Sequence, residues 1–291
     1  MKNVSLIIFL LCSLCLQARP KGKEFTLRIR YTLKCDSTCN RILFKTVIPQ
    51  SIPGRQHIKG IIFSVEPDSI YMSGNNKFAL FDLERPTPGE QISIQIKGKI
   101  YAQDYNTRCK QPPSDQEDVS GWLKAENCID SDSPEIKAKA DSLKGGTQEN
   151  TIENIFHYTQ KNFTYVPNDY DIGALGMLRK KRGDCTEFTD LFVALCRAAG
   201  IPARHTYGIN VSSDGHGAQH SWAEVYMKDH GWVSFDPTPG NDATFSTLGR
   251  PYVLFSLVRN CRELKNRWFF FYYRYWGQHT PQIHADYLIL R

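Results

Sequence analysis

The sequence predicts an α+β protein in which a helix bearing a cysteine packs on an antiparallel sheet, preceded by a small β-sandwich-like domain. Three observations carry this prediction: strand-like alternation within residues 20–108, helical spacing after Cys185, and a pair of alternating segments within residues 219–240. The chain has 291 residues, which is enough for one or two domains with a substantial core.

The first 18 residues have the pattern of a signal peptide. Lys2 precedes an apolar run from Val4 to Leu16, and Ala18 is a small residue at a suitable cleavage point. The run is short for a transmembrane helix. However, Leu16 is unfavourable at position −3 from the cleavage point, so an uncleaved membrane anchor is the alternative. We expect a secreted, periplasmic or cell-surface protein, with membrane contact only if this segment is uncleaved.

Export would place the cysteines in an oxidising compartment. Removal of residues 1–18 reduces nine cysteines to seven, an odd number that leaves at least one thiol unpaired. Cys35 and Cys39 flank a short turn, and Cys109 and Cys128 bracket a polar segment, which makes each a candidate bridge.

Residues 20–108 predict a β-rich N-terminal domain. In EFTLRIRYTLK and QISIQIKGKI, apolar residues alternate with polar ones, as in a half-buried strand. The domain contains no group of residues with the pattern of a catalytic or metal-binding site, and we interpret it as a packing or binding module. The polar residues 109–133 predict a linker to a second domain over residues 134–245, where a proline follows a serine helix cap.

Residues 246–291 predict an aromatic-rich extension that packs on the core. The run WFFFYYRYW, residues 268–276, is too short to span a bilayer. We favour a buried packing element over a membrane-interface or carbohydrate-stacking surface.

The net charge of +6 is modest and spread along the chain. Its densest cluster, residues 179–182, lacks interleaved aromatics for base stacking, and we interpret it as a solvated loop. Nucleic acid is therefore not an expected partner.

The helix that carries Cys185 has marked ends. Apolar residues recur at helical spacing over residues 188–199, and Gly200 ends the pattern. Asp184 and Glu187 are three residues apart, an acidic variant of the capping box, so Asp184 is the predicted N-cap. Cys185 is then the first helical residue.

This position favours a reactive sulfur. The unpaired N–H groups of the first turn and the positive end of the helix dipole stabilise a thiolate, which is the attacking species, although neighbouring acids oppose the effect. Cys196 lies on nearly the same helical face among apolar residues, and we expect a core residue or half of a disulfide there.

A nucleophilic cysteine needs a base and a group that orients the base. Residues 219–240 predict an antiparallel hairpin. In such a hairpin the residue numbers of directly opposed residues add up to a constant, and their side chains point to the same side of the sheet. The numbers of His220 and Asp236 have an even sum, so a three- or five-residue loop can place them opposite each other. Glu224 would then pair with Trp232, whereas a two- or four-residue loop would separate the histidine from the aspartate.

His205 and His216 are alternative candidates for the base. Together with Cys185 they are also candidate ligands of a metal ion. The spacing lacks the paired ligands that zinc sites use. We expect no metal and no cofactor.

The segments GDCTEFTDLFVALCRAAGIPARHTYGI, HSWAEVY and GWVSFDPTPG resemble the core of the transglutaminase-like superfamily over about residues 150–240. The resemblance implies a papain-like fold with Cys185 as nucleophile, His220 as base and Asp236 as its orienting partner. It also implies an oxyanion hole that combines the nucleophile's N–H with an upstream aromatic donor, for which Tyr165 is the best match. The family's calcium sites cannot be placed on any residues, and the β-rich N-terminal part looks like what often precedes this core in bacterial members.

The expected function is that of an exported thiol enzyme that attacks an amide carbonyl and forms a thioester acyl-enzyme. Water would resolve the intermediate in a cysteine peptidase or amidase, and an amine would do so in a protein-glutamine acyltransferase; we favour water. The expected substrate is a protein or peptide, including cell-wall peptides. The alternative is a non-catalytic cell-surface binding protein that retains the fold.

Overall fold

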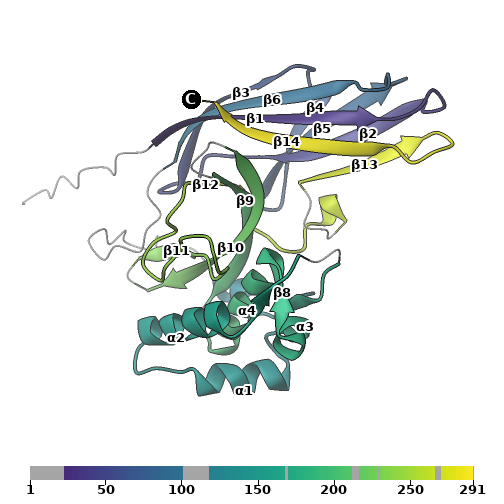
Figure 1. Ribbon diagram of the computed structural model, residues 1–291. Helices are drawn as coiled ribbons and strands as arrows, with labels where there is room; N and C mark the ends of the chain where they lie inside the picture. The colour runs from purple at the N-terminus through teal and green to yellow at the C-terminus, as the bar shows by residue number, and fades with distance from the viewer. Residues whose placement is uncertain are drawn as a thin grey trace, which may run out of the picture.

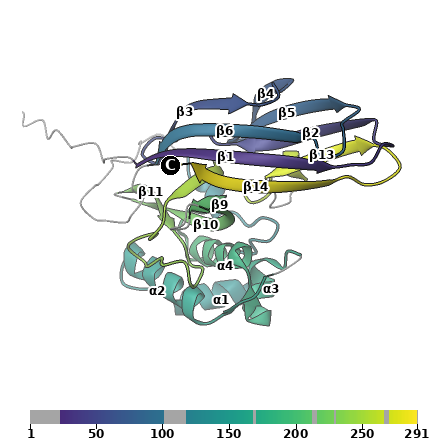
Figure 2. The same ribbon diagram turned by 45° about the horizontal axis from the view of Figure 1, so that its top comes forward.

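The computed structural model describes residues 23–100, 118–167, 170–211, 216–228, 230–265 and 270–290. The predicted signal segment and Cys109 lie outside these ranges. Within them, no helix combines the length and apolar character needed to cross a bilayer. Figures 1 and 2 show layered strands at one end of the molecule, helices at the other, and a further sheet between them.

The first sheet of the sandwich has the strand order β14-β1-β6-β3, and neighbouring strands are antiparallel. Its strands are β1 (Lys23–Lys34), β3 (Gln56–Phe63), β6 (Gln91–Ile100) and β14 (Gln282–Leu290). The alternating apolar residues of β1 and β6 are buried in one core. The predicted alternation of both strands is confirmed, because burial of one face of each strand forms a sandwich core.

The second sheet has the order β13-β2-β5-β4. It consists of β2 (Arg41–Ile48), β4 (Ser69–Ser73), β5 (Asn76–Glu84) and β13 (Phe271–Trp276). Aromatic rings join the two sheets: Tyr31 of the first lies 4.9 Å from Phe44 of the second and 5.4 Å from Phe271, measured between ring centroids. Such edge-to-face contacts add to the burial that holds the sheets together.

The C-terminal strands belong to the sandwich, which corrects the prediction of an extension over residues 246–291 packing on the core. β13 pairs with β2 and β14 pairs with β1. In the described part of the aromatic run, Phe270 is buried, whereas the strand Phe271–Trp276 is only partly buried, so the run is not a fully buried packing element. Pairing between strands that are far apart in the sequence leaves no local pattern, so the positions of β13 and β14 could not be predicted from the sequence.

The central sheet has the order β11-β10-β9-β12. Its strands are β9 (Ala203–Val211), β10 (Gly217–Met227), β11 (Gly231–Phe235) and β12 (Tyr252–Ser256). The helix α4 (Cys185–Ala198) packs on β9 and β10 and is surrounded by α1 (Pro134–Ser142), α2 (Gln148–Lys161) and α3 (Gly173–Lys180). The short strands β7 (Thr164–Tyr165) and β8 (Arg182–Gly183) and the 3₁₀ turns Ser120–Leu123 and Arg262–Leu264 complete the described elements.

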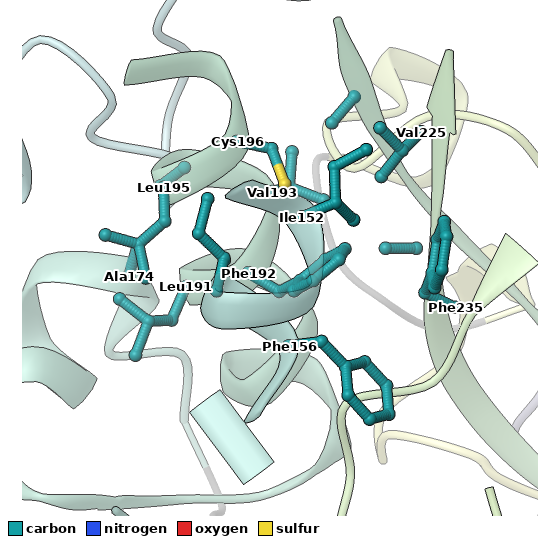
Figure 3. Packing of buried hydrophobic residues seen from close by; sticks show 14 of the residues in the cluster. Ile152, Phe156, Ala174, Leu191, Phe192, Val193, Leu195, Cys196, Val225 and Phe235 are labelled. Carbon is teal, nitrogen blue, oxygen red and sulfur yellow. The ribbon is translucent and has the colours of Figure 1, made fainter. Parts of the chain in front are cut away.

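An aromatic core joins α4 to the central sheet (Figure 3). Phe192 of α4 lies 6.3 Å from Phe156 of α2 and 5.9 Å from Phe235 of β11. Cys196 is fully buried in the same cluster as a free thiol, which confirms the first of its two predicted roles. The α+β class is therefore confirmed, with the cysteine helix packed on an antiparallel sheet.

The described part of the predicted linker, residues 118–133, packs on the helical domain. Ile129 is fully buried, and Arg197 of α4 donates to Lys124 O at 2.7 Å and to Glu126 Oε1 at 2.8 Å. This stretch is therefore part of the folded core, although its polar composition suggested a linker.

The predicted bridge between Cys35 and Cys39 is not formed, because both are free thiols. Cys35 Sγ donates to Pro86 O at 3.5 Å, and Cys39 Sγ donates to Arg41 O at 3.8 Å. The two sulfurs thus hydrogen-bond to different carbonyl groups.

A buried ion cluster joins the sandwich to the central sheet. Glu224 of β10 is fully buried and contacts Arg55, which precedes β3, at 2.9 Å and Arg204 of β9 at 2.6 Å. Burial disfavours the charged carboxylate, but the two guanidinium groups outweigh it and hold the pKa of Glu224 below its usual value. The carboxylate therefore lies between two arginines and offsets the repulsion between them.

Substitution of Glu224 by Gln should leave two buried guanidinium groups without a neutralising charge. We expect the free energy of unfolding to fall by about 3 kcal/mol, because removing one partner of a buried ion pair leaves an uncompensated charge. Urea denaturation measures the change. Glu135→Gln, which removes the exposed partner of Arg179, is the control and should leave the free energy of unfolding almost unchanged. Equal losses in the two variants would contradict a structural role for the cluster.

Candidate active site

The start of α4 is built by a capping box, as predicted. The Asp184 carboxylate accepts from Thr186 N at 2.8 Å, and the Glu187 carboxylate accepts from Asp184 N at 3.0 Å. A Cβ on Gly183 would lie 2.6 Å from Glu187 Cβ, so the residue before the cap must be glycine. Cys185 is consequently the first residue of the helix.

His220 and Asp236 form a buried pair. His220 Nε2 lies 2.7 Å from Asp236 Oδ2, and both side chains are nearly inaccessible to solvent. The side chain of Cys185 also hydrogen-bonds to His220. Because Nε2 faces the carboxylate, Nδ1 is the ring nitrogen left for the sulfur. The structure thus brings together the three residues that the sequence singled out.

The hairpin that carries this pair differs from the predicted register by two positions. Glu224 pairs with Ser234 and not with Trp232, because the three-residue loop starts one residue later than expected. The sum of paired numbers stays even, so the prediction that His220 and Asp236 share a face holds. The shift places them diagonally across the strands, within reach of each other.

The charges of the pair support each other. Burial opposes a charge on His220, but the carboxylate of Asp236 and the hydrogen bond with Cys185 outweigh it and raise the pKa of His220 to about 10. Burial likewise opposes charge on Asp236, yet His220 and two further donors keep the pKa of that carboxyl below its usual value. At neutral pH the pair is an imidazolium and a carboxylate.

Two of the donors to Asp236 were not found from the sequence. Tyr252 Oη donates to Asp236 Oδ2 at 2.6 Å, and Asn241 Nδ2 lies 3.3 Å from the same oxygen. Burial, followed by the adjacent negative charge, raises the pKa of Tyr252 far above its usual range, so its hydroxyl remains a donor. Tyr252 reaches the site because β12 pairs with β9, a contact that no local pattern marks.

A third donor, the backbone N–H of Thr238, lies 3.0 Å from Asp236 Oδ1. An aspartate that accepts from the N–H two residues later is a common turn, so the segment Asp-Pro-Thr could have revealed this contact. It fixes the second carboxylate oxygen and leaves Oδ2 for His220.

Tyr165 lies beside the start of α4. Its strand β7 runs parallel to β8, with Tyr165 paired to Gly183. The ring is 46% exposed and lies 6.4 Å from the ring of Phe188. Burial, and then the charge of Cys185, raise the pKa of Tyr165 to about 12. The residue is therefore a neutral, accessible neighbour of the sulfur.

The rival histidines lie in other surroundings. His205 is fully buried, with Nδ1 at 2.8 Å from Asp190 Oδ1, and burial lowers the pKa of its ring. Arg259 donates to the same carboxylate at 3.0 Å, so His205 belongs to an ion cluster beneath α4. His216 forms a bridge with Leu288 of β14. In the ranges that the structure describes, no three His, Cys, Asp or Glu side chains group as metal ligands would.

The protein has a papain-like α+β fold, in which Cys185 at a helix start hydrogen-bonds to a strand histidine that an aspartate orients. A family model described as the Transglutaminase-like superfamily matches residues 137–237. The matched segment carries Cys185 and His220 and ends one residue after Asp236.

Two curated relatives are similar to parts of the chain. YebA of Bacillus subtilis is 35% identical over 109 residues, which cover 32% of this chain and 15% of YebA. An uncharacterized protein of Haemophilus influenzae is 27% identical over 221 residues, which cover 62% of this chain and 59% of that protein. The chain therefore matches less than two thirds of the length of either relative.

The whole fold has a counterpart among solved structures. A crystal structure from Cytophaga hutchinsonii, described as a "Putative Cysteine Protease", has a TM-score of 0.64 and 17% identity, with 93% of this chain and 92% of that chain covered. At this identity the similarity concerns the fold, which extends over the sandwich as well as the domain with the cysteine.

Replacement of Asp236 by Asn should remove the main support for the charge on His220. We expect the pKa of His220 to fall from about 10 toward its usual value of about 6.5. An NMR titration of the His220 ring measures the shift, with the exposed Asp242→Asn as the control that should leave it in place. A His220 pKa that is unchanged in Asp236→Asn would refute the electrostatic account.

Proposed function

We propose that the protein is an exported thiol enzyme that cleaves or exchanges amide bonds through a Cys185–His220–Asp236 triad. The observation that carries the proposal is the hydrogen-bonded chain from Cys185 at the start of α4 through His220 to Asp236. An imidazolium beside the sulfur favours the thiolate, which is the attacking form. The match of residues 137–237 to the model of the Transglutaminase-like superfamily supports the same chemistry.

The proposed reaction has two stages. The Cys185 thiolate adds to the amide carbonyl carbon, and the resulting tetrahedral oxyanion collapses as the C–N bond breaks. The His220 imidazolium gives its proton to the leaving amine, and a thioester to Cys185 remains. Neutral His220 then takes a proton from water or from an amine, which attacks the thioester and releases the thiolate.

The oxyanion would be held at the helix start. The helix ladder leaves the N–H of Cys185 without an intrahelical acceptor, and the positive end of the α4 dipole lies there. Tyr165, which neighbours Cys185 and keeps its hydroxyl proton, is the proposed second donor.

We propose a protein or peptide substrate, with cell-wall peptides included, and water as the usual acceptor. The pattern of residues 1–18 supports export. The matched lengths of the relatives cover only part of each, so the acceptor and substrate rest on the site and not on the relatives.

One experiment tests the reaction type. The protein is incubated with casein and a fluorescent primary amine, and incorporated amine, new N-termini and released ammonia are measured. We expect turnover by the native protein and by Cys35→Ala, which removes a thiol of the sandwich, and none by Cys185→Ala. New N-termini or ammonia without amine incorporation identify a hydrolase, and incorporation identifies an acyltransferase. Turnover that survives in Cys185→Ala would contradict the proposed function.

Replacement of Tyr252 by Phe should slow turnover without weakening substrate binding. Tyr252 is 1% exposed and its hydroxyl donates to Asp236, and the loss of a hydrogen bond to a charged group corresponds to about a tenfold to hundredfold fall in kcat. The control is Tyr31→Phe, which removes an equally buried hydroxyl in the sandwich. Steady-state kinetics should show KM within about twofold of the native value. A Tyr252→Phe variant with native kcat would mean that the hydroxyl does not position the triad.

A further inference from the structure

A cavity of about 370 Å³ lies where the sandwich meets the central sheet. Its lining comes from three strands: Arg28 and Arg30 of β1, residues 285–288 of β14, and His216 with Gly217 at the start of β10. None of the triad residues lines it. The cavity is therefore separate from the site described above, although the strand at its wall also carries His220.

Two guanidinium groups dominate the charge of this cavity. Arg28 and Arg30 alternate with the buried Ile29, so both side chains leave the same face of the sheet, about 6.6 Å apart along the strand. Arg30 Nε is buried and has no hydrogen-bond partner among the described residues. Two like charges held this close are stabilised by an anion that both can bind.

The carboxylate in the lining does not neutralise this pair. Asp286 is opposite Arg30 in the sheet register, yet its Oδ1 lies 3.2 Å from His284 Nε2. No described carboxylate forms an ion pair with Arg28 or Arg30. The cavity consequently keeps a net positive charge, and its recessed walls concentrate the field of the two arginines.

The chemistry of the lining selects an oxyanion. Guanidinium groups bind carboxylate and phosphate through two parallel N–H donors. β14 is also the edge strand of its sheet, and an isolated bridge joins its Leu288 to His216. An edge strand offers backbone groups to an extended polypeptide. A carboxylate on such a polypeptide matches both features.

The cavity is also within reach of the triad along one strand. Four residues of β10 separate His216 from His220, which corresponds to about 13 Å in a strand. Four residues of an extended peptide span a similar length. A peptide of about four residues is therefore long enough to span from the level of His220 to the level of His216 at the cavity wall.

We propose that this cavity binds a carboxylate of an acidic polypeptide substrate and so directs acidic segments to the triad. That the bound polypeptide is a substrate rests on the proposed function, but its binding to the cavity needs no catalysis.

The test uses a fluorescein-labelled tetraglutamate peptide and the protein carrying Cys185→Ala, with fluorescence anisotropy as the readout. We expect saturable binding of tetraglutamate, no binding of tetraglutamine, and at least about a tenfold loss of affinity in Arg28→Gln/Arg30→Gln. The matched control is Lys97→Gln/Lys99→Gln, which removes two positive charges from the same sheet outside the cavity and should change affinity less than about twofold. Arg28→Lys/Arg30→Lys keeps the charge but not the fork-shaped donors, and should bind at least about threefold more weakly.

Four results would overturn the proposal. Equal losses in the arginine and lysine double variants would assign binding to a general basic face. Equal binding of tetraglutamine would remove the role of the carboxylate, and native affinity in Arg28→Lys/Arg30→Lys would remove that of the guanidinium geometry. Binding of inorganic phosphate at the arginines without binding of tetraglutamate would assign the cavity to another oxyanion. Each of these leaves the triad untouched, since turnover by Cys185 is measured separately.

Discussion

The 2.7 Å hydrogen bond between His220 and Asp236 is the interaction on which the rest of the site depends. A charged pair survives burial only when its remaining lone pairs and protons are satisfied, because desolvation costs several kcal/mol per ion. Here the hydroxyl of Tyr252 and the backbone N–H of Thr238 donate hydrogen bonds to the Asp236 carboxylate. The sulfur of Cys185 then meets an imidazole whose charge and orientation are fixed before any substrate arrives.

Two further buried ion clusters hold the parts of the molecule in place around this pair. Glu224 joins the sandwich to the central sheet, and Asp190 joins α4 to Arg259, which follows β12. One cluster involves β10, which carries His220, and the other involves α4, which carries Cys185. The sandwich is therefore tied to the central sheet by charge as well as by apolar packing.

Local patterns in the sequence predicted the local parts of the structure. The spacing of Asp184 and Glu187 located the start of α4, because a capping box involves residues only three apart. The even sum for His220 and Asp236 predicted their shared face, because side chains alternate along a strand. The even sum of the two residue numbers could not give the register of the hairpin between β10 and β11, since the register depends on where the loop begins. Contacts between distant segments left no such mark: the C-terminal strands of the sandwich and Tyr252 became visible only in the folded chain.

The central claim of the proposed function is that His220 activates Cys185 for attack. Its most direct test is the rate of iodoacetamide alkylation at pH 6, followed by peptide mass spectrometry, in the native protein and in His220→Asn. Because only the thiolate reacts, we expect fast alkylation of Cys185, a rate about 10²-fold lower in His220→Asn, and no alkylation of the buried Cys196 in either protein. A Cys185 that reacts no faster than Cys35, or at the same rate without His220, would contradict the account.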